Sequence, residues 1–307
     1  MSLPEKKPAG KNISTFLQLL GRSFNEIKKN DPLRMAGATA FFTTFALPPI
    51  LIILFQVFTL FLSQRLVGAE LARLLSDTLG SEVSAELRQT ARGFRNLVQH
   101  WYTAIPGFLF MVFVATTLFT VVKNTLDDIW NIKVKEKPGL LFYLKFRARS
   151  LGVILSAGIL FLAGIFMDGF EILAGKNIDQ IWPGGGGFFK GAMNEIVGVI
   201  IVTIWFIVLF RFLADGRPGW KAVKIGGLLT GLLFSGGKTL LSSLMKNSNI
   251  SFVYGGSASF VLILLFVFYS SFILYFGACF IKIYSEETGK PVEPRSKAHR
   301  FRLMEVD

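Results

Sequence analysis

Six long apolar segments constrain this chain more than any other feature of its sequence. A helix needs about 20 apolar residues to cross the hydrocarbon core of a bilayer. Of the 307 residues, 52% are hydrophobic and 17% are charged, whereas a soluble domain carries about 25% charged residues. We therefore expect an all-α, polytopic membrane protein with six transmembrane helices, at about 36–62, 103–122, 150–173, 193–213, 222–245 and 257–282.

Lysine and arginine are distributed unequally between the two sides of this topology. If both termini lie on one side, that side carries 24 of the 33 Lys and Arg residues, the other side carries 8, and Lys238 lies inside a span. Positive charge accumulates in cytoplasmic loops, so we expect both termini to be cytoplasmic. The same charge predicts contact with anionic lipid headgroups on that side. A nucleic-acid-binding surface is the weaker interpretation of the net charge of +13.

Two regions outside the spans show apolar residues at helical spacing. Residues 13–27 predict an amphipathic helix along the cytoplasmic membrane surface, and residues 64–101 predict external amphipathic helices between spans one and two. Composition further predicts a disordered tail at 1–10, a single membrane domain at 11–286 and a disordered cytoplasmic tail at 287–307.

The stretch TGLLFSGGKTL, residues 230–240, ends in the Gly-Lys-Thr of a phosphate-binding P-loop. That motif requires a glycine at position 232, where this chain has Leu232, and it requires a preceding strand. The flanks here are continuously apolar. Lys238 is therefore interpreted as a lysine inside a transmembrane helix, and no cofactor or metal is expected.

Small residues accompany this lysine along one face of the helix. Gly227, Gly231 and Ser235 recur at intervals of four, and Lys238 follows three residues later. Small residues allow helices to approach closely in a bilayer, so this face is expected to meet protein. Gly277 belongs to a similar small-residue stripe in the sixth span.

Pro48 and Pro49 interrupt the first span. Each lacks an N–H, so the carbonyls of Thr44 and Phe45 lose their helical partners and the helix should bend. A bend that only serves packing and a hinge both fit this pattern.

Three acidic residues lie near the expected outer ends of the spans, at Asp168, Glu171 and Glu195. Charges inside a membrane are costly and mark function by default. We expect Lys238 to pair with Glu195 or with Asp168. In the alternative, the acids face external water and the lysine reaches up towards the surface.

Four stretches carry a resemblance to a known family: MAGATAFFTTFALPPILII, VVKNTLDDIWNIK, GGLLTGLLFSGGKTL and FVYGGSASFVLILLFVFYSSFILYFGACF. On these stretches the chain, over about residues 15–285, resembles the YihY/BrkB family of bacterial inner-membrane proteins, which have about six spans. Two family glutamates are replaced here, one by Ser235 and one by Cys279.

The resemblance implies a bacterial inner-membrane location and an association with lipid or envelope-component transport. A ribonuclease label on the family is widely regarded as mistaken, and this chain has only two histidines, His100 and His299, at opposite ends of the topology. We therefore expect no enzyme but a transporter- or flippase-like protein that moves a lipid or other envelope amphiphile near Lys238. A non-transporting scaffold for envelope proteins is the alternative, and a homo-oligomer is left open.

Overall fold

The computed structural model describes residues 13–60, 63–79, 85, 89, 101–134, 144–160, 162–164, 185–247, 258–295 and 298–301. Its labelled helices are α1 (Ile13–Lys29), α2 (Pro32–Thr59), α3 (Gln64–Leu79), α5 (Trp101–Ile129), α7 (Gly185–Phe212), α8 (Trp220–Asn247) and α10 (Ala258–Glu287). A further helix, Leu144–Gly164, carries no label. Four short strands are β1 (Ile132–Val134), β2 (Gly216–Arg217), β3 (Glu293–Pro294) and β4 (Ala298–Arg300).

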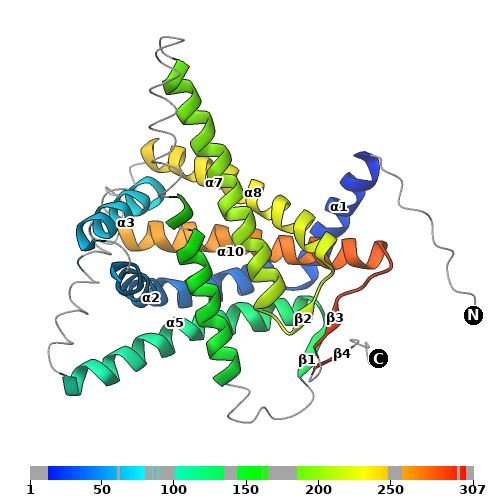
Figure 1. The fold of residues 1–307 in the computed structure, drawn as a ribbon. Helices are drawn as coiled ribbons and strands as arrows, with labels where there is room; N and C mark the ends of the chain where they lie inside the picture. Colours follow the sequence, from blue (N-terminus) through cyan, green and yellow to red (C-terminus); the bar gives the residue numbers. More distant parts are fainter. Residues whose placement is uncertain are drawn as a thin grey trace, which may run out of the picture.

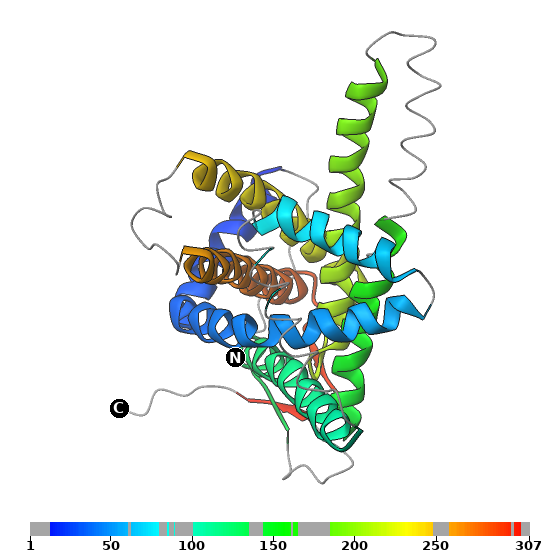
Figure 2. The same ribbon diagram turned by 90° about the vertical axis from the view of Figure 1, so that its left-hand side faces the viewer.

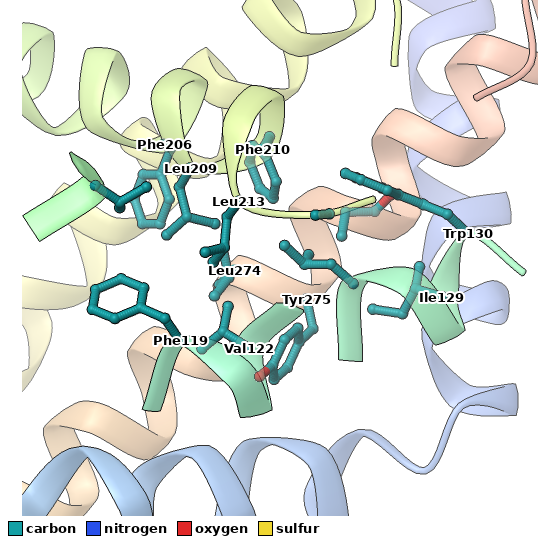
Figure 3. Close-up of a cluster of buried hydrophobic side chains, with 14 of the residues drawn as sticks. Phe119, Val122, Ile129, Trp130, Phe206, Leu209, Phe210, Leu213, Leu274 and Tyr275 are labelled. Atoms are coloured by element: carbon teal, nitrogen blue, oxygen red, sulfur yellow. The ribbon is translucent and has the colours of Figure 1, made fainter. Parts of the chain in front are cut away.

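Helix α10 lies at the centre of the bundle (Figure 1) and packs against α1, α2, α5 and α8. It is almost continuously apolar and is the most buried of the candidate membrane-crossing helices. Helix α7 runs steeply across the other helices (Figure 1) and packs against α8. The main hydrophobic core lies between α5, α7 and α10, where Phe119, Leu213 and Leu274 approach one another (Figure 3).

The two ends of the bundle are built differently. At one end α5 and α7 finish and all four strands lie, and we call this the strand end (Figure 1). At the other end lie α3 and the C-terminal part of α8, and we call this the far end. The charge distribution in the sequence predicts that the strand end is cytoplasmic.

The expectation of an all-α membrane protein fits a structure with several long apolar helices. Within the described residues, four helices are long and apolar enough to cross a membrane: Pro32–Thr59, Leu144–Gly164, Glu195–Phe212 and Phe260–Glu287. Helices α5 and α8 occupy the other two expected spans. Neither is among those four; in α8, Lys221, Lys224 and Lys238 lower the hydropathy of the helix.

The helices expected beside the spans are partly described. Helix α1 covers the predicted N-terminal segment, and its buried Leu19 packs with Phe280 and Ile283 of α10. Leu19 and Ile27 therefore contact protein, whereas Phe16, Leu17 and Phe24 are exposed, and a position along the membrane surface stays a prediction. Helix α3 lies in the segment expected to be external, and most of residues 80–100 lie outside the described part of the chain.

The tail that follows α10 differs from the disorder that its composition predicts. Strand β3 pairs antiparallel with β2, and β4 pairs antiparallel with β1. Val292 in this segment is buried. Composition misses this order because the pairing partners lie far away in the sequence, after α7 and after α5. Residues 1–12 and 302–307 lie outside the described part of the chain.

Helix α8 packs through glycines on two of its faces. A Cβ at Gly227 would overlap Ile207 of α7, and a Cβ at Gly231 would overlap Thr203 of the same helix. A Cβ at Gly226 would overlap Ile281 of α10. Gly277 of α10 lies against Thr230 of α8 in the same way. The glycines therefore set how closely α8 approaches both neighbours.

Helix α2 changes direction near its middle in both ribbon views (Figures 1 and 2), in the part that contains the buried Pro48 and Pro49. The neighbouring threonine hydroxyls do not reach the carbonyls that the prolines leave without partners. Thr43 donates to the carbonyl of Thr39 at 2.7 Å, and Thr44 donates to that of Ala40 at 2.8 Å. The bend is thus a feature of the structure, and hinge motion at this point stays a prediction.

We predict that Gly231→Ala lowers the stability of the protein, because the added methyl group must displace Thr203. Overpacking of this kind costs about 1–3 kcal/mol. Gly236→Ala is the matched control in the same helix, since a Cβ there meets no other atom within 4 Å. The control should be neutral or stabilising by up to about 1 kcal/mol through helix propensity. Thermal unfolding in detergent measures both, and equal melting temperatures for the two variants would contradict the packing.

Candidate functional site

A buried network of charged side chains joins three segments at the strand end. Lys123 and Asp127 lie four residues apart in the last turns of α5, which places them on one face of the helix. Lys123 Nζ lies 2.7 Å from Asp127 Oδ2 and 2.7 Å from Asp215 Oδ2. Asp215 follows α7 in the sequence. The three side chains are only 9%, 8% and 4% exposed, so this is an interior ion network.

The remaining carboxylate oxygens in the network are also paired. Asp127 Oδ1 accepts the backbone N–H groups of Asp215 at 2.8 Å and Gly216 at 3.3 Å. Asp215 Oδ1 lies 3.2 Å from Nη1 of Arg149, which comes from the helix Leu144–Gly164. Two aspartates therefore face two cations, and the network of four side chains is electrically balanced.

Burial and ion pairing act in opposite directions on the titration of this network. Burial raises the pKa of Asp127 to about 6, against the opposing effect of Lys123. Burial alone would lower the pKa of Lys123, but Asp127 and Asp215 outweigh it and the pKa is raised. At neutral pH the network is therefore charged, and Asp127 is the member that takes up a proton on mild acidification.

Trp130 and Gly216 fix the backbone around these charges. Trp130 is fully buried (Figure 3), and its Nε1 donates to the carbonyl of Ala278 in α10 at 3.1 Å. A Cβ at position 216 would lie 2.5 Å from Cε3 of this indole ring. The missing side chain at Gly216 is what allows its N–H to approach Asp127.

A second ion pair at the strand end joins α1 to α10. Lys282 Nζ lies 2.6 Å from Glu26 Oε1, and both side chains are largely buried. Cys279, which replaces a family glutamate, is buried one turn earlier in α10. The strand end is therefore held by charged contacts from five segments, which suits it to a structural role.

Lys238, the lysine expected inside a span, lies in the half of α8 nearer the far end. It is partly buried, and within the described part of the chain it forms no hydrogen bond or ion pair. Glu195 is exposed on α7, and the expected Lys238–Glu195 pair is not formed. Asp168 and Glu171 lie outside the described residues, so pairing with Asp168 stays a prediction.

The divergence of two helices accounts for the missing Lys238–Glu195 pair. Helices α7 and α8 are in tight contact at Gly227 and Gly231. Beyond that contact the two helices run in different directions, as Figure 2 shows. The antiparallel order alone would set the two residues level with each other, but the crossing of the helices separates them.

Several polar groups lie near Lys238 along α8, some on α8 itself and one on α10. Tyr269 of α10 lies against Gly237, and its hydroxyl donates to the carbonyl of Leu233 at 3.1 Å. Ser235 is partly buried, and its carbonyl accepts a hydrogen bond from Thr239 Oγ1 at 3.2 Å. Lys238 thus lies in a part of α8 where small and hydroxyl-bearing residues stand between apolar turns.

Sequence reasoning missed the members of the buried ion network. Lys123, Asp127 and Arg149 were interpretable only as charges at the ends of spans, and such charges usually mark topology. The spacing of Lys123 and Asp127 was a signal that they face one another, but nothing in it indicated Asp215. In the described part of the chain, no group of three or more His, Cys, Asp or Glu residues could hold a metal ion.

The comparisons with known proteins agree on one kind of protein. A family model described as "Virulence factor BrkB" matches residues 23–301. A "UPF0761 membrane protein" of Teredinibacter turnerae is 25% identical over 276 residues, which cover 89% of this chain and 61% of the relative. One of Saccharophagus degradans is 24% identical over 285 residues, covering 90% of this chain and 62% of the relative. The chain thus spans about three fifths of the length of these relatives. No solved structure matches.

We predict that Asp127→Ala strongly destabilises the protein. Removing one partner of a buried ion pair costs about 3–5 kcal/mol. Asp127→Asn should cost less, because its amide oxygen can still accept the two backbone N–H groups. Asp128→Asn is the control, since Asp128 is the exposed neighbour and such surface changes stay within about 0.5 kcal/mol. Thermal unfolding in detergent tests the order, and a harmless Asp127→Ala would contradict the network.

We predict a pH dependence that belongs to Asp127. Its folded pKa of about 6 lies above the ordinary value of 3.8, so the folded protein takes up a proton at a pH where the unfolded chain does not. The contribution of Asp127 to the free energy of unfolding therefore rises as pH falls through 6. Wild type should gain stability relative to Asp127→Asn between pH 7.5 and pH 5. A pH-independent difference from Asp127→Asn would contradict this assignment.

Proposed function

This chain belongs to the Virulence factor BrkB family of membrane proteins, and we propose that it is transporter- or flippase-like. In this proposal it resides in the bacterial inner membrane with both termini in the cytoplasm. It moves a lipid or another envelope-related amphiphile through a polar site near Lys238. Because the curated relatives are longer than this chain, the proposal concerns the membrane domain that they share.

The observation that carries the proposal is that Lys238 forms no ion pair with any of the residues that the structure describes. The residue is partly buried in α8, and in the described residues no carboxylate lies within ion-pair distance. An ammonium group inside a membrane helix is costly, and such groups usually mark a substrate or ion pathway. The natural ligand for a lone cation at this depth is an anionic headgroup, which would supply the missing counter-charge when it passes.

The contrast between the two ends of the bundle supports a moving part. The strand end is held by the ion network of Lys123, Asp127, Asp215 and Arg149. Towards the far end, α7 and α8 diverge beyond their glycine contact (Figure 2). Helix α2, which contains Pro48 and Pro49, changes direction near its middle (Figures 1 and 2). A protein fixed at one end and splayed at the other can change the opening between its helices without losing its fold.

One observation favours the alternative of a non-transporting scaffold. Helix α7 carries an exposed apolar row of Ile196, Ile200 and Ile204, which could meet a membrane partner as well as lipid. In that case Lys238 has a structural role. The two functions differ in what happens when this lysine is removed.

We predict that Lys238→Ala lowers the rate of lipid movement across liposomes that contain the purified protein. The probe is a fluorescent phosphatidylglycerol analogue whose outer-leaflet fraction is quenched by dithionite. Losing a charge-assisted contact of about 1.5–3 kcal/mol lowers the rate roughly tenfold or more. Lys238→Arg should keep most of the rate because it keeps the charge. Lys224→Ala is the control in the same helix, since Lys224 is exposed near the strand end.

The outcomes separate the two functions. Unchanged lipid movement in Lys238→Ala, or no protein-dependent movement at all, would contradict the transporter proposal. A lower melting temperature of Lys238→Ala without any loss of movement would support the scaffold.

A further inference from the structure

Three arginines at the strand end have no carboxylate partner among the residues that the structure describes. The two aspartates of the ion network are already paired with Lys123 and Arg149. Arg211, Arg217 and Arg295 lie beside this network, and within the described residues none of them forms an ion pair. The three charges therefore add to a network that is already balanced.

Arg295 lies close to the ion network and to the other two arginines. Its backbone N–H donates to the carbonyl of Asp215 at 2.9 Å, and its Nη2 donates to the carbonyl of Phe212 at 3.4 Å. Its Nε is buried and has no hydrogen-bond partner. Burial lowers the pKa of Arg295, and so does repulsion by Arg149, Arg217 and Arg211, while Asp215 opposes them. Arg295 therefore lies among other cations, and its Nε–H makes no hydrogen bond in the described structure.

Arg211 and Arg217 are held at the same place by different means. Arg211 Nη1 donates to the carbonyl of Pro218, and its guanidinium group lies 4.8 Å from the centre of the Trp220 ring. Arg217 lies on β2 and is exposed. Glu293 stands opposite it in the β2–β3 register, but their side chains form no ion pair in the described structure. Arg217 is therefore free to bind an anion.

An exposed aromatic pair adjoins these arginines. Phe212 is 46% exposed and Trp220 is 50% exposed, and their rings meet edge to face at 6.4 Å. Tryptophan rings of this kind favour the interface between headgroups and hydrocarbon. The cations therefore lie beside a surface that suits the headgroup region of a bilayer.

We propose that Arg211, Arg217 and Arg295 form a binding site for a phosphate group, which belongs to an anionic phospholipid headgroup or to free phosphate. Guanidinium groups present planar, forked donors that match phosphate oxygens. A bound phosphate would contact the exposed guanidinium group of Arg217 and reduce the repulsion among the three cations. The site lies at the end of the protein opposite the lysine invoked for transport, so it stands independently of the proposed function.

The test measures stabilisation of the full chain in nanodiscs. One set contains phosphatidylcholine alone, a second also contains phosphatidylglycerol, and a third contains phosphatidylcholine with inorganic phosphate in the buffer. A ligand that binds only the folded state raises the melting temperature. We expect phosphatidylglycerol to raise the melting temperature of the wild type, and native mass spectrometry to detect retained phosphatidylglycerol. A matching rise with inorganic phosphate would assign the site to the free ion as well.

Arg217→Gln is the decisive variant, because Arg217 is exposed and its loss leaves no carbonyl or ring without a partner. It should lose at least half of the stabilisation and bind the lipid about tenfold more weakly, as expected when a charge-assisted contact is lost. Arg217→Lys should recover only part of the effect, since lysine keeps the charge without the fork. Lys238→Ala should retain the full effect, which separates this site from the transport proposal.

Lys29→Gln is the control for non-specific attraction, since it removes one exposed cation from the end of α1. It should keep the stabilisation by phosphatidylglycerol. An equal loss in Lys29→Gln and Arg217→Gln would overturn the proposal, because net charge alone would then explain the effect. An unchanged effect in Arg217→Gln, or no stabilisation by either phosphate source, would overturn it too.

Discussion

The strand end depends on the interactions that the carboxylate of Asp127 makes. One of its oxygens meets Lys123, and the other accepts two backbone N–H groups from the turn after α7. That turn places Asp215, which holds Arg149 and, through its carbonyl, the backbone of Arg295. A buried carboxylate with all its partners is stable only as a whole, since a missing partner leaves an uncompensated charge. The network therefore favours one arrangement of α5, α7, the helix Leu144–Gly164 and the tail.

The same network decides where spare positive charge remains. Because both aspartates are used internally, Arg211, Arg217 and Arg295 form no ion pair within the described residues, and they lie beside the exposed Phe212 and Trp220. Lys238 is the corresponding spare charge towards the far end, in a helix with no acidic partner for it in the described residues. The molecule thus offers cationic groups at two levels along its length. Each needs an anion from outside the described structure, and a membrane rich in anionic lipid can supply one at either level.

The sequence predicted the glycine face of α8, but of the two partners expected for Lys238 the pair with Glu195 is not formed. The stripe of Gly227 and Gly231 is visible at helical spacing, whereas the divergence of α7 and α8 beyond it depends on how the two helices cross. The strand pairing of the tail after α10 could not be predicted from the sequence either. Its strands are too short and too polar to be recognised alone, and they are ordered by partners more than 70 residues away. Gly216 likewise gains its importance only from the indole ring of Trp130 beside it.

By itself, the sequence determined the class of protein, the approximate positions of the long apolar helices and the uneven distribution of Lys and Arg along the chain. Hydropathy and charge bias are properties of contiguous segments, so they need no knowledge of the fold. The tertiary structure alone decided which charges neutralise one another. Asp127 and the turn that it binds are 88 residues apart, and Lys282 and Glu26 are 256 apart. Such pairs arise only when packing brings distant helices together, and low solvent access then makes each unpaired group costly.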